Sequence, residues 1–357
     1  PPRRTGRAIL PDRTLNKGAF SMFTYTLRRL LLAIPTLLFI ALAIFLLLEL
    51  SPGDPMADMP LTIPPEVREQ MRLALGLGEA WYIRFYKWLY MFSIVEPSYV
   101  LANMTGIESL AVEGQRIISF QTRSPVADIV AQRLPQTLWV VGLSYIFGIL
   151  VAVPLGVYSA YRQYSWVDQL GAFVSMVGFS LPTFFTGPLL MLVFSIWLGW
   201  FPIIYDTTLV VDSLQDFGLQ LRQMAMPVFV LTLYNAAQIN RFMRAAMLDN
   251  FTQDYVRTAR AKGMSEKVVV LVHVLRNSMI PVVTVIALGI PTIFTGAIIT
   301  EQIFRVNGLG QLLIIAIYAS DFPMVLTLSM VFAILIVGFN LIADILYAVL
   351  DPRIRYD

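Results

Sequence analysis

Long apolar runs separated by shorter polar stretches dominate this chain. The first run covers residues 30–50, which would extend about 31 Å as an α-helix, enough to cross the hydrocarbon core of a bilayer. Further runs lie at about residues 137–160, 170–198, 226–248, 279–300 and 324–350. The pattern therefore predicts an all-α integral membrane protein with six transmembrane helices.

The polar stretches divide the chain into five parts. Residues 1–29 read as a basic tail and the entry to the first helix, residues 30–50 as that helix, and residues 51–136 as a sizeable external segment. Residues 137–350 form the transmembrane core, which includes a polar loop at 249–278, and residues 351–357 form a C-terminal tail.

The composition supports this assignment. Hydrophobic residues make up 57% of the 357 residues and charged residues only 14%, against about 25% charged in soluble proteins. With both termini cytoplasmic, 17 of the 26 Lys and Arg residues fall on the cytoplasmic side, while the two short external loops contain only Arg222 and Arg305. Basic residues gather on the cytoplasmic side of membrane proteins, so the net charge of +3 reflects topology and indicates no nucleic-acid partner.

Several kinds of chemistry are excluded by residue types that the chain lacks. It has no cysteine and one histidine, His273, so neither a Cys/His metal site nor a histidine-dependent catalytic triad is expected. No Gly-x-x-x-x-Gly-Lys-Ser/Thr sequence occurs, so the chain lacks a P-loop for nucleotide phosphates. We therefore expect no catalytic residue, no metal and no cofactor, and any ATP must be bound by partner subunits.

The polar stretch from Asp254 to Pro281 is predicted to form two short helices around Gly263. Val256, Ala259 and Gly263 recur at helical spacing and would give the first helix a small, smooth face for docking into a groove on another protein. Glycine tolerates the positive φ of a helix C-terminal cap. The alternative interpretation is a solvated basic loop between two spans.

The sequence Tyr-Val-Arg-Thr-Ala-Arg-Ala-Lys-Gly at 255–263 resembles the cytoplasmic coupling loop of ABC-importer permeases of the dipeptide/oligopeptide/nickel family. It lacks the acidic residue of the general importer signature, and Pro281 comes later than that signature expects, as is usual in this family. Residues 28–35, 51–55, 124–138, 306–310 and 340–355 also resemble the family, although Asn307 stands where it usually has proline. The resemblance runs from about residue 27 to the end.

This resemblance implies a type I permease subunit in the bacterial inner membrane. Such a subunit forms half of a translocation path for peptides or related small solutes, which an extracytoplasmic substrate-binding protein delivers. Its implied partners are a homologous second permease subunit, giving a heterodimer, and two cytoplasmic ATPase subunits. The implied coupling residues are Tyr255, Val256, Arg257, Thr258, Ala259, Arg260, Ala261, Lys262 and Gly263.

Polar residues inside the apolar runs are candidates for a second site. Thr183, Thr292 and Thr295 are candidates to line the translocation path, although small residues also serve close helix packing. Of the acidic residues near span ends, Asp344 is expected to pair with a basic residue and Glu301 to face water.

Other functions remain open from the residues alone. A secondary transporter would need inverted repeats and buried charges at mid-membrane, and an intramembrane enzyme would need a nucleophile with its base; the chain has no evident form of either. An importer for a nickel chelate, glutathione or an oligosaccharide is also open, since selectivity in such importers lies mostly in the binding protein.

Overall fold

The computed structural model describes residues 13–50, 66 and 78–350, with all their side chains except those of residues 13–25, 292, 293, 295, 296 and 346–350. The expected tails at 1–12 and 351–357 and most of the external segment between residues 51 and 77 lie outside this part. In the described residues the regular structure is helical, with one isolated antiparallel bridge between Ile118 and Pro125. This confirms the predicted all-α class.

Helices of very different length follow one another along the chain. In the part of the chain that the structure describes, three π-helical segments, Met91–Val95, Met191–Trp197 and Val269–Val274, continue α3, α7 and α10, and a 3₁₀ turn lies at Glu108–Leu110. The α-helices among the described residues are α1 (Arg13–Leu50), α3 (Trp81–Tyr90), α4 (Glu96–Thr105), α5 (Val126–Tyr161), α6 (Trp166–Ser180), α7 (Thr183–Leu190), α8 (Leu214–Phe251), α9 (Asp254–Ala261), α10 (Glu266–Val268), α11 (Leu275–Phe304), α12 (Leu309–Tyr318) and α13 (Phe322–Leu350).

Four of the described helices are long and apolar enough to cross a membrane. They comprise α1 from Thr26, α5, the continuous helix Glu266–Pro291, and α13 to Ile345, and the bent pair α6–α7 would make a fifth. α8 covers the run expected at 226–248 but is not among them. Amides such as Asn235 and Asn240, together with Arg244, interrupt its apolar sequence. The described helices thus include four or five that could cross a membrane, whereas the sequence predicted six transmembrane helices.

The run at 170–198 is broken rather than continuous. α6 ends at Ser180 and α7 begins at Thr183, and the two axes differ by 112°. Pro182 explains the break, because proline has no N–H to donate and pushes the preceding residue out of the helical region. Leu181 accordingly has extended backbone angles, with ψ at 122°.

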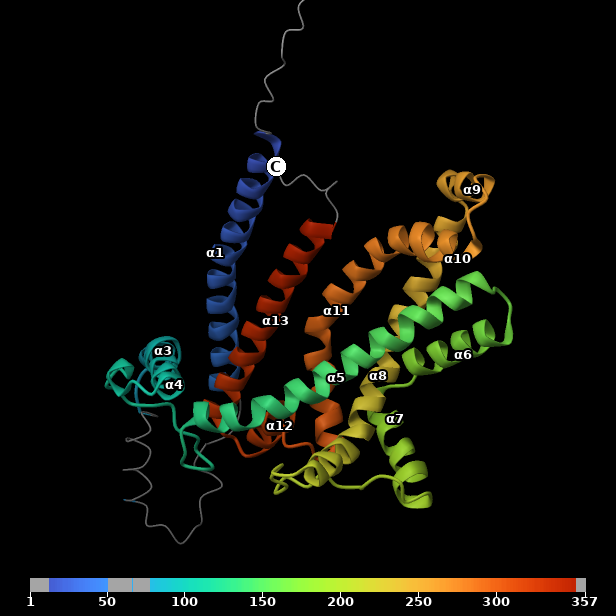
Figure 1. The fold of residues 1–357 in the computed structure, drawn as a ribbon. Coiled ribbons are helices and arrows are strands. Elements are labelled where there is room, and N and C mark those ends of the chain that lie inside the picture. The colour runs from blue at the N-terminus through green and yellow to red at the C-terminus, as the bar shows by residue number, and fades with distance from the viewer. Residues whose placement is uncertain (1–12, 51–65, 67–77, 351–357) are drawn as a thin grey trace, which may run out of the picture.

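α8 packs along α5 on one side and α11 on the other (Figure 1). The contact with α5 follows a stripe of small residues, each four positions apart and all buried. A β-carbon added at Gly156 would lie 2.7 Å from the β-carbon of Met243, so only glycine allows this approach. Small residues let helix backbones come close where lipid supplies no hydrophobic driving force. The stripe consists of Ser144, Gly148, Ala152, Gly156 and Ala160.

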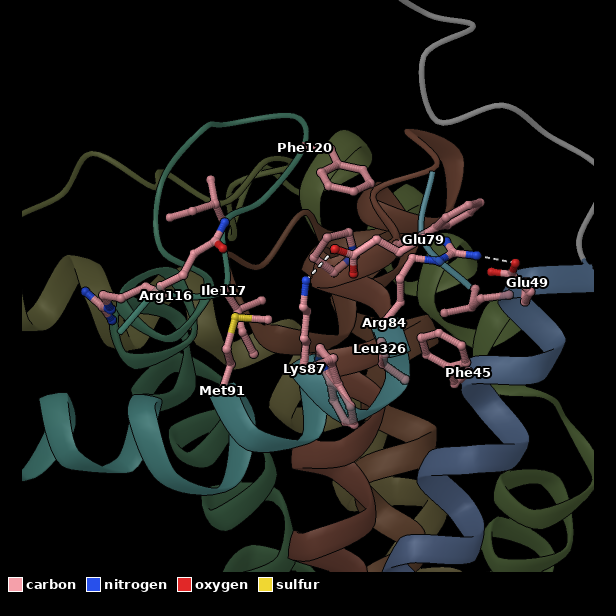
Figure 2. A pocket seen from close by; sticks show the side chains of 16 residues that line it. Phe45, Glu49, Glu79, Arg84, Lys87, Met91, Arg116, Ile117, Phe120 and Leu326 are labelled. Atoms are coloured by element: carbon pink, nitrogen blue, oxygen red, sulfur yellow. Dashed lines mark hydrogen bonds and ion pairs between the residues drawn. The ribbon is translucent and has the colours of Figure 1, made fainter. Parts of the chain in front are cut away.

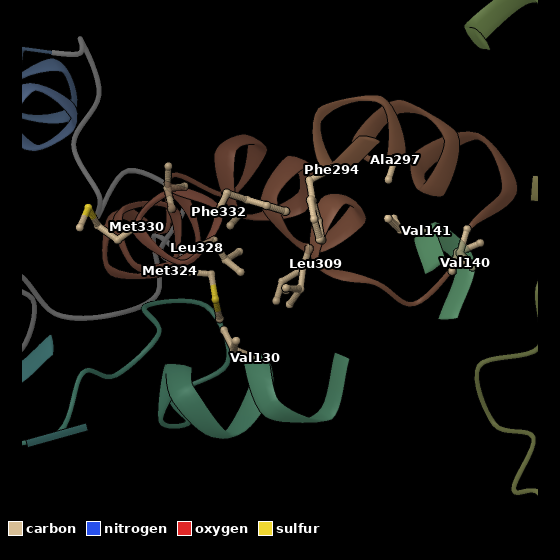
Figure 3. Packing of buried hydrophobic residues seen from close by; sticks show 14 of the residues in the cluster. Val130, Val140, Val141, Phe294, Ala297, Leu309, Met324, Leu328, Met330 and Phe332 are labelled. Carbon is tan, nitrogen blue, oxygen red and sulfur yellow. The ribbon is translucent and has the colours of Figure 1, made fainter. Parts of the chain in front are cut away.

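Apolar side chains fill the space where α5, α11, α12 and α13 meet. Phe294 of α11, Leu309 of α12 and Leu328 of α13 are fully enclosed there, and Val130 and Val140 reach them from α5 (Figure 3). This cluster holds α12 and α13 against the α5–α8–α11 group.

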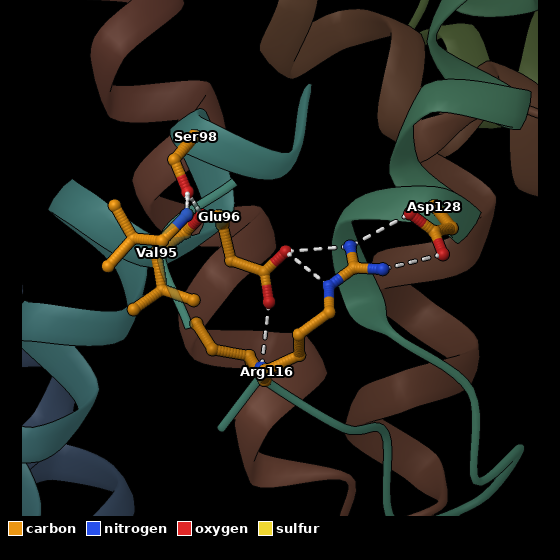
Figure 4. Close-up of polar contacts among 7 residues, drawn as sticks. Val95, Glu96, Ser98, Arg116 and Asp128 are labelled. Carbon is orange, nitrogen blue, oxygen red and sulfur yellow. Dashed lines mark hydrogen bonds and ion pairs between the residues drawn. The ribbon is translucent and has the colours of Figure 1, made fainter. Parts of the chain in front are cut away.

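An ion-paired cluster organises the described part of the external segment. Arg116 donates to Glu96 at 2.8 Å and to Asp128 at 2.8 and 3.0 Å, so it connects α4 to the start of α5 (Figure 4). These two carboxylates raise the pKa of Arg116, because each hydrogen bond favours the charged guanidinium. The second oxygen of Glu96 accepts from the backbone N–H of Ile117 at 2.7 Å. The loop leading into α5 is thereby fixed.

The two ends of the molecule differ in what they contain. The start of α1, the end of α13 and the short helix α9 lie toward one end, and α3, α4, α12 and α7 lie toward the other (Figure 1). At the first end Arg29 of α1 forms an ion pair with Asp344 of α13, as predicted for Asp344. We refer below to the end containing α9 as the α9 end.

Candidate functional site

The predicted coupling stretch folds as the eight-residue helix α9 followed by a sharp turn. Asp254 lies in the first turn of α9, where a carboxylate is favoured by the helix dipole. The hydroxyl of Thr258 donates to the backbone carbonyl of Asp254 at 2.9 Å. We call α9, the turn at 262–265 and α10 the knuckle.

Gly263 ends α9 in the way the sequence predicted. Its φ is +75°, its N–H donates to the carbonyl of Arg260 at 2.9 Å, and the N–H of Met264 donates to that of Ala259 at 3.3 Å. This pair of bonds defines a Schellman cap, which favours glycine at the left-handed position. A β-carbon at Gly263 would meet no atom within 4 Å, so within this chain the requirement for glycine is conformational and not steric.

Two of the three residues of the face predicted to dock into a partner, Val256 and Ala259, are instead buried inside the chain, while Gly263 is exposed. Val256 is 0% exposed and Ala259 5% exposed, and both belong to a cluster with Met247 of α8 and with Val269 and Val274 of the π-helical segment. Small apolar residues recurring on one face predict burial, but the pattern does not identify the surface that covers them. In this structure that surface is the chain itself.

The second half of the knuckle also differs from the prediction. Ser265 is the N-cap residue of α10, as expected, but its side chain accepts no capping hydrogen bond. α10 is not a separate short helix, because it runs through the π-helical segment directly into α11. A π-helical turn holds an extra residue and is common at functional sites. α10, the last part of the knuckle, is therefore the beginning of the long helix that ends at Phe304.

The outward surface of the knuckle is basic and polar. Arg257 is 76% exposed, and seven of the nine predicted coupling residues are exposed. Arg260 donates to Glu266 across the turn at 2.7 Å, and this bond raises the pKa of Arg260. The exposed residues among the nine are Tyr255, Arg257, Thr258, Arg260, Ala261, Lys262 and Gly263.

Polar contacts fasten the knuckle and its surroundings to the helices. The hydroxyl of Tyr255 donates to Asn250 of α8 at 2.5 Å, and the hydroxyl of Ser278 of α11 donates to the carbonyl of Ala246 of α8 at 3.1 Å. Arg244 of α8 binds the Asp168 carboxylate of α6 at 2.7 and 3.0 Å. A force applied to the knuckle would therefore act on α8 and α11 together.

The predicted path residues do not form a described cluster. Thr183 is the first residue of α7 and is half-buried. Thr292 and Thr295 lie in α11, but their side chains are outside the described residues. A buried polar contact does join two of the apolar helices: the side-chain amide of Asn240 in α8 donates to the hydroxyl of Ser175 in α6 at 2.8 Å.

Glu301 is the residue that sequence reasoning placed wrongly. It was expected to face water, but it is 0% exposed. Its carboxylate accepts hydrogen bonds from the Thr137 hydroxyl at 2.7 Å and from the backbone N–H groups of Gly310 and Gln311. The sequence signal was present, since Gly308 and Gly310 shortly after a carboxylate allow a close backbone approach. Among the described residues no group of three or more acidic or histidine side chains is positioned to hold a metal ion.

Comparison with known proteins identifies relatives over nearly the whole chain. Residues 152–356 match the family described as binding-protein-dependent transport system inner membrane component, and residues 22–141 match its N-terminal companion family. The oligopeptide transport system permease protein AppB of Bacillus subtilis is 37% identical over 343 residues, which cover 94% of this chain and all of AppB. The glutathione transport system permease protein GsiC of Escherichia coli K12 is 37% identical over 339 residues, with the same coverage.

Proposed function

The chain belongs to the family of binding-protein-dependent transport system inner-membrane components, and we propose that it is a permease subunit of an ABC importer. It is a multi-pass protein of the bacterial inner membrane. In the proposed role it forms half of a translocation path, and ATP hydrolysis on separate subunits drives transport.

The observation that carries this proposal is the knuckle. It combines an exposed basic surface with a buried face that joins it to α8 and α11. Such a surface suits a partner that changes conformation during its reaction cycle. A displacement of the knuckle by that partner would be transmitted to the two long helices α8 and α11. We assign the outward residues, Tyr255, Arg257, Thr258 and Lys262, to contact with the ATPase, and Val256 and Ala259 to anchoring.

The proposed topology has six spans with both termini in the cytoplasm. The spans are α1, α5, the bent pair α6–α7, α8, the continuous helix α10–α11, and α13. α8 can carry amides through the membrane because α5 and α11 cover much of it. The knuckle and the Arg29–Asp344 pair then lie on the cytoplasmic side, and α3, α4 and α12 on the external side.

The proposed solutes are peptides or related small molecules, because relatives that match 94% of this chain are named for oligopeptide and glutathione transport. We propose that a homologous second permease completes the path, that two ATPase subunits bind ATP, and that an extracytoplasmic binding protein delivers the solute. The chain itself needs no cofactor in this scheme. A nickel chelate or an oligosaccharide is the alternative solute, and secondary transport is the alternative mechanism.

Reconstitution tests the proposal directly. The chain, its sister permease and the two ATPases are placed in proteoliposomes with the binding protein outside and ATP inside, and uptake of labelled peptide is measured. We expect uptake to stop when either the ATPases or ATP is omitted. Uptake that continued under an ion gradient without ATP would support secondary transport and refute the proposal. A complex with two copies of this chain and no sister permease would refute the heterodimer.

A further inference from the structure

One face of α8 carries polar and aromatic residues that its neighbours leave partly open. α5, α6 and α11 pack against α8. Tyr234, Gln238 and Arg241 follow one another at intervals of four and three residues, so they lie on the same face of the helix. Tyr234 is 38% exposed, Arg241 is exposed and Gln238 is half-buried. We call these three residues the α8 stripe.

Arg241 holds its charge against an aromatic ring and not against a carboxylate. Its guanidinium carbon lies 5.5 Å from the centre of the Phe179 ring in α6, and Phe179 in turn stacks on Tyr234 with 6.5 Å between ring centres. Arg244, one turn later in α8, is paired with Asp168, whereas Arg241 has no ion pair with any described residue. A guanidinium that contacts a ring through its flat face keeps N–H donors at its edge, and their fork fits a carboxylate.

The direction of the Arg241 side chain argues against contact with lipid tails. Asp168 lies in the first turn of α6, directly after the short turn at 162–165, which is cytoplasmic in the proposed topology. Phe179 is 11 residues further along α6, about 16 Å along the helix axis, so the guanidinium extends away from the cytoplasmic side. An arginine facing hydrocarbon would extend to the nearer head groups. The α8 stripe therefore faces water or a polar surface within the membrane.

The cations that line the cavity between α1, α3 and α13 differ from Arg241 in this respect. This cavity has a volume of about 320 Å³, and each cation among its described lining residues is held in an ion pair. Figure 2 shows two of these cations extending toward their carboxylates. Their charges are already matched, so the cavity offers no free cation to an anionic solute. The pairs are Arg84 with Glu49, Lys87 with Glu79, and Arg116 with Glu96.

We propose that Arg241 binds the carboxylate of the solute as it passes along the translocation path. The rings of Phe179 and Tyr234 contact apolar parts of the solute, and the amide of Gln238 lies beside its peptide groups. Thr183, a predicted path residue, begins α7 four residues after Phe179. This inference rests on the proposed function, in which the solutes are peptides or related small molecules. A peptide ends in a carboxylate, which accepts two parallel hydrogen bonds from an arginine.

Uptake of a labelled tripeptide tests the role of Arg241. The complete complex is placed in proteoliposomes with the binding protein outside and ATP inside. Arg241→Gln should lower uptake about tenfold or more, because losing hydrogen bonds to a charged group commonly weakens binding by such a factor. ATP hydrolysis and the recovery of intact complex should stay close to those of the unmodified complex, whereas a packing defect would lower them together with uptake. Arg241→Lys, which keeps the charge but lacks the fork, should retain part of the uptake.

Arg162→Gln is the matched control for Arg241→Gln. Arg162 is exposed in the turn between α5 and α6, and its guanidinium carbon also lies 5.5 Å from a ring centre, that of Tyr161. The substitution therefore removes the same charge and the same kind of contact. The Arg162→Gln complex should take up the tripeptide like the unmodified one, and an equal loss of uptake in the two variants would overturn the inference.

Reaction of a single cysteine measures whether water and solute reach the α8 stripe, since the chain has no cysteine of its own. Gln238→Cys should react with a charged, membrane-impermeant thiosulfonate, and the tripeptide should slow this reaction several-fold during ATP-driven transport. Leu150→Cys is the control and should not react, because Leu150 is 62% exposed among exposed apolar neighbours on α5. These neighbours are Ile146, Phe147 and Val151.

Each contrary result overturns the inference in its own way. Unchanged uptake with Arg241→Gln, in a complex that transports, would overturn it and leave the proposed function intact. Loss of the sister permease from that variant would mean that Arg241 pairs with the other subunit. An unreactive Gln238→Cys would mean that lipid or protein covers the stripe. Unmodified complex without ATP-driven uptake would refute the proposed function itself, and the inference with it.

Discussion

The carboxylate of Glu301, near the end of α11, accepts a 2.7 Å hydrogen bond from the backbone N–H of Gly310, near the start of α12. The N–H of Gln311 donates to the same oxygen at 3.2 Å. Unpaired N–H groups and the helix dipole make the start of a helix favourable for an anion. A β-carbon at Gly310 would lie 2.5 Å from the Cα of Ile298, so glycine is needed for this closeness. α12 is thus bound to the helix that begins at the knuckle.

Glu301→Gln is expected to destabilise the protein by about 2 to 3 kcal/mol, since hydrogen bonds to a charged group contribute about 1.5 to 3 kcal/mol and an amide cannot accept at both oxygen positions. The apparent Tm of the purified protein measures this. The matched control is Glu108→Gln, an exposed residue, which should change stability by less than about 0.5 kcal/mol. Equal effects of the two changes would contradict the role of Glu301.

Gly263→Val is expected to leave membrane insertion intact while lowering ATPase association and solute uptake. The left-handed conformation costs a residue with a β-carbon about 1 to 2 kcal/mol, so the Schellman cap should open and the exposed surface of the knuckle should move. Measurements are co-purified ATPase and ATP-driven uptake.

Gly218→Val serves as the control for Gly263→Val. Gly218 lies within α8, and a β-carbon there also meets no atom within 4 Å, but its backbone is helical and allows any residue. This variant should retain coupling. Lys262→Gln should lower coupling less than Gly263→Val, because it keeps the backbone conformation of the cap and removes only one charge, and an exposed charge usually contributes less than about 1 kcal/mol. Full ATPase binding and uptake with Gly263→Val would remove the main support for the coupling role.

Thr292→Leu and Thr295→Leu are predicted to reduce uptake without reducing assembly, if these residues line the translocation path. A polar hydroxyl replaced by a larger apolar side chain would obstruct a hydrated passage and would leave the distant knuckle unchanged. Uptake and the yield of intact complex are measured in parallel, and Thr183→Leu is tested beside them. Loss of assembly would instead assign these threonines to helix packing.

Arg116→Met and Asp128→Asn are predicted to differ strongly, although both break the same ion pair. The first leaves the Glu96 carboxylate, 7% exposed, without its cation, and removing one partner of a buried pair costs about 3 to 5 kcal/mol. Asp128 is 43% exposed, so water can replace it, and the expected cost is below about 1 kcal/mol. Apparent Tm and protease resistance of the external segment are the measurements.

The double variant Arg116→Met with Glu96→Met completes this test. Replacing a buried ion pair by apolar residues of similar volume is often nearly neutral, so the second change should recover much of the stability lost with the first. A double variant less stable than Arg116→Met alone would show that Glu96 acts mainly through its bond to the backbone of Ile117.

The spacing of apolar residues and glycines predicts the local structure of this chain better than it predicts which residues contact one another in the folded protein. Apolar runs located the helices, and the backbone freedom of glycine predicted the positive φ of Gly263. The same pattern identified Val256 and Ala259 as a contact face, but the covering surface comes from Val269 and Val274, which reach it only after the chain turns. Glu301 is likewise buried because α12 folds back onto α11. The spacing of residues along one helix cannot predict such a contact between helices.

At Pro182, in contrast, a single residue determined the structure against the average hydropathy of the surrounding run. The hydropathy of residues 170–198 is that of a single span, and only the Ser-Leu-Pro sequence at 180–182 indicates that the helix is broken there. Because the residue before a proline is disfavoured in the helical region, Pro182 predicts two helices in this run, whereas the average hydropathy predicts one.

The bend between α6 and α7 has a consequence for solvation. The last carbonyls of one helix and the first N–H groups of the next lack partners within their helices, and lipid tails offer no hydrogen bonds in exchange. The N–H groups of Leu181 and Phe185 find the carbonyls of Val177 and Pro182, which satisfies part of this demand. In the proposed topology the remaining groups require either penetrating water or the polar surface of another polypeptide, so we expect the backbone at residues 180–183 to be shielded from hydrocarbon.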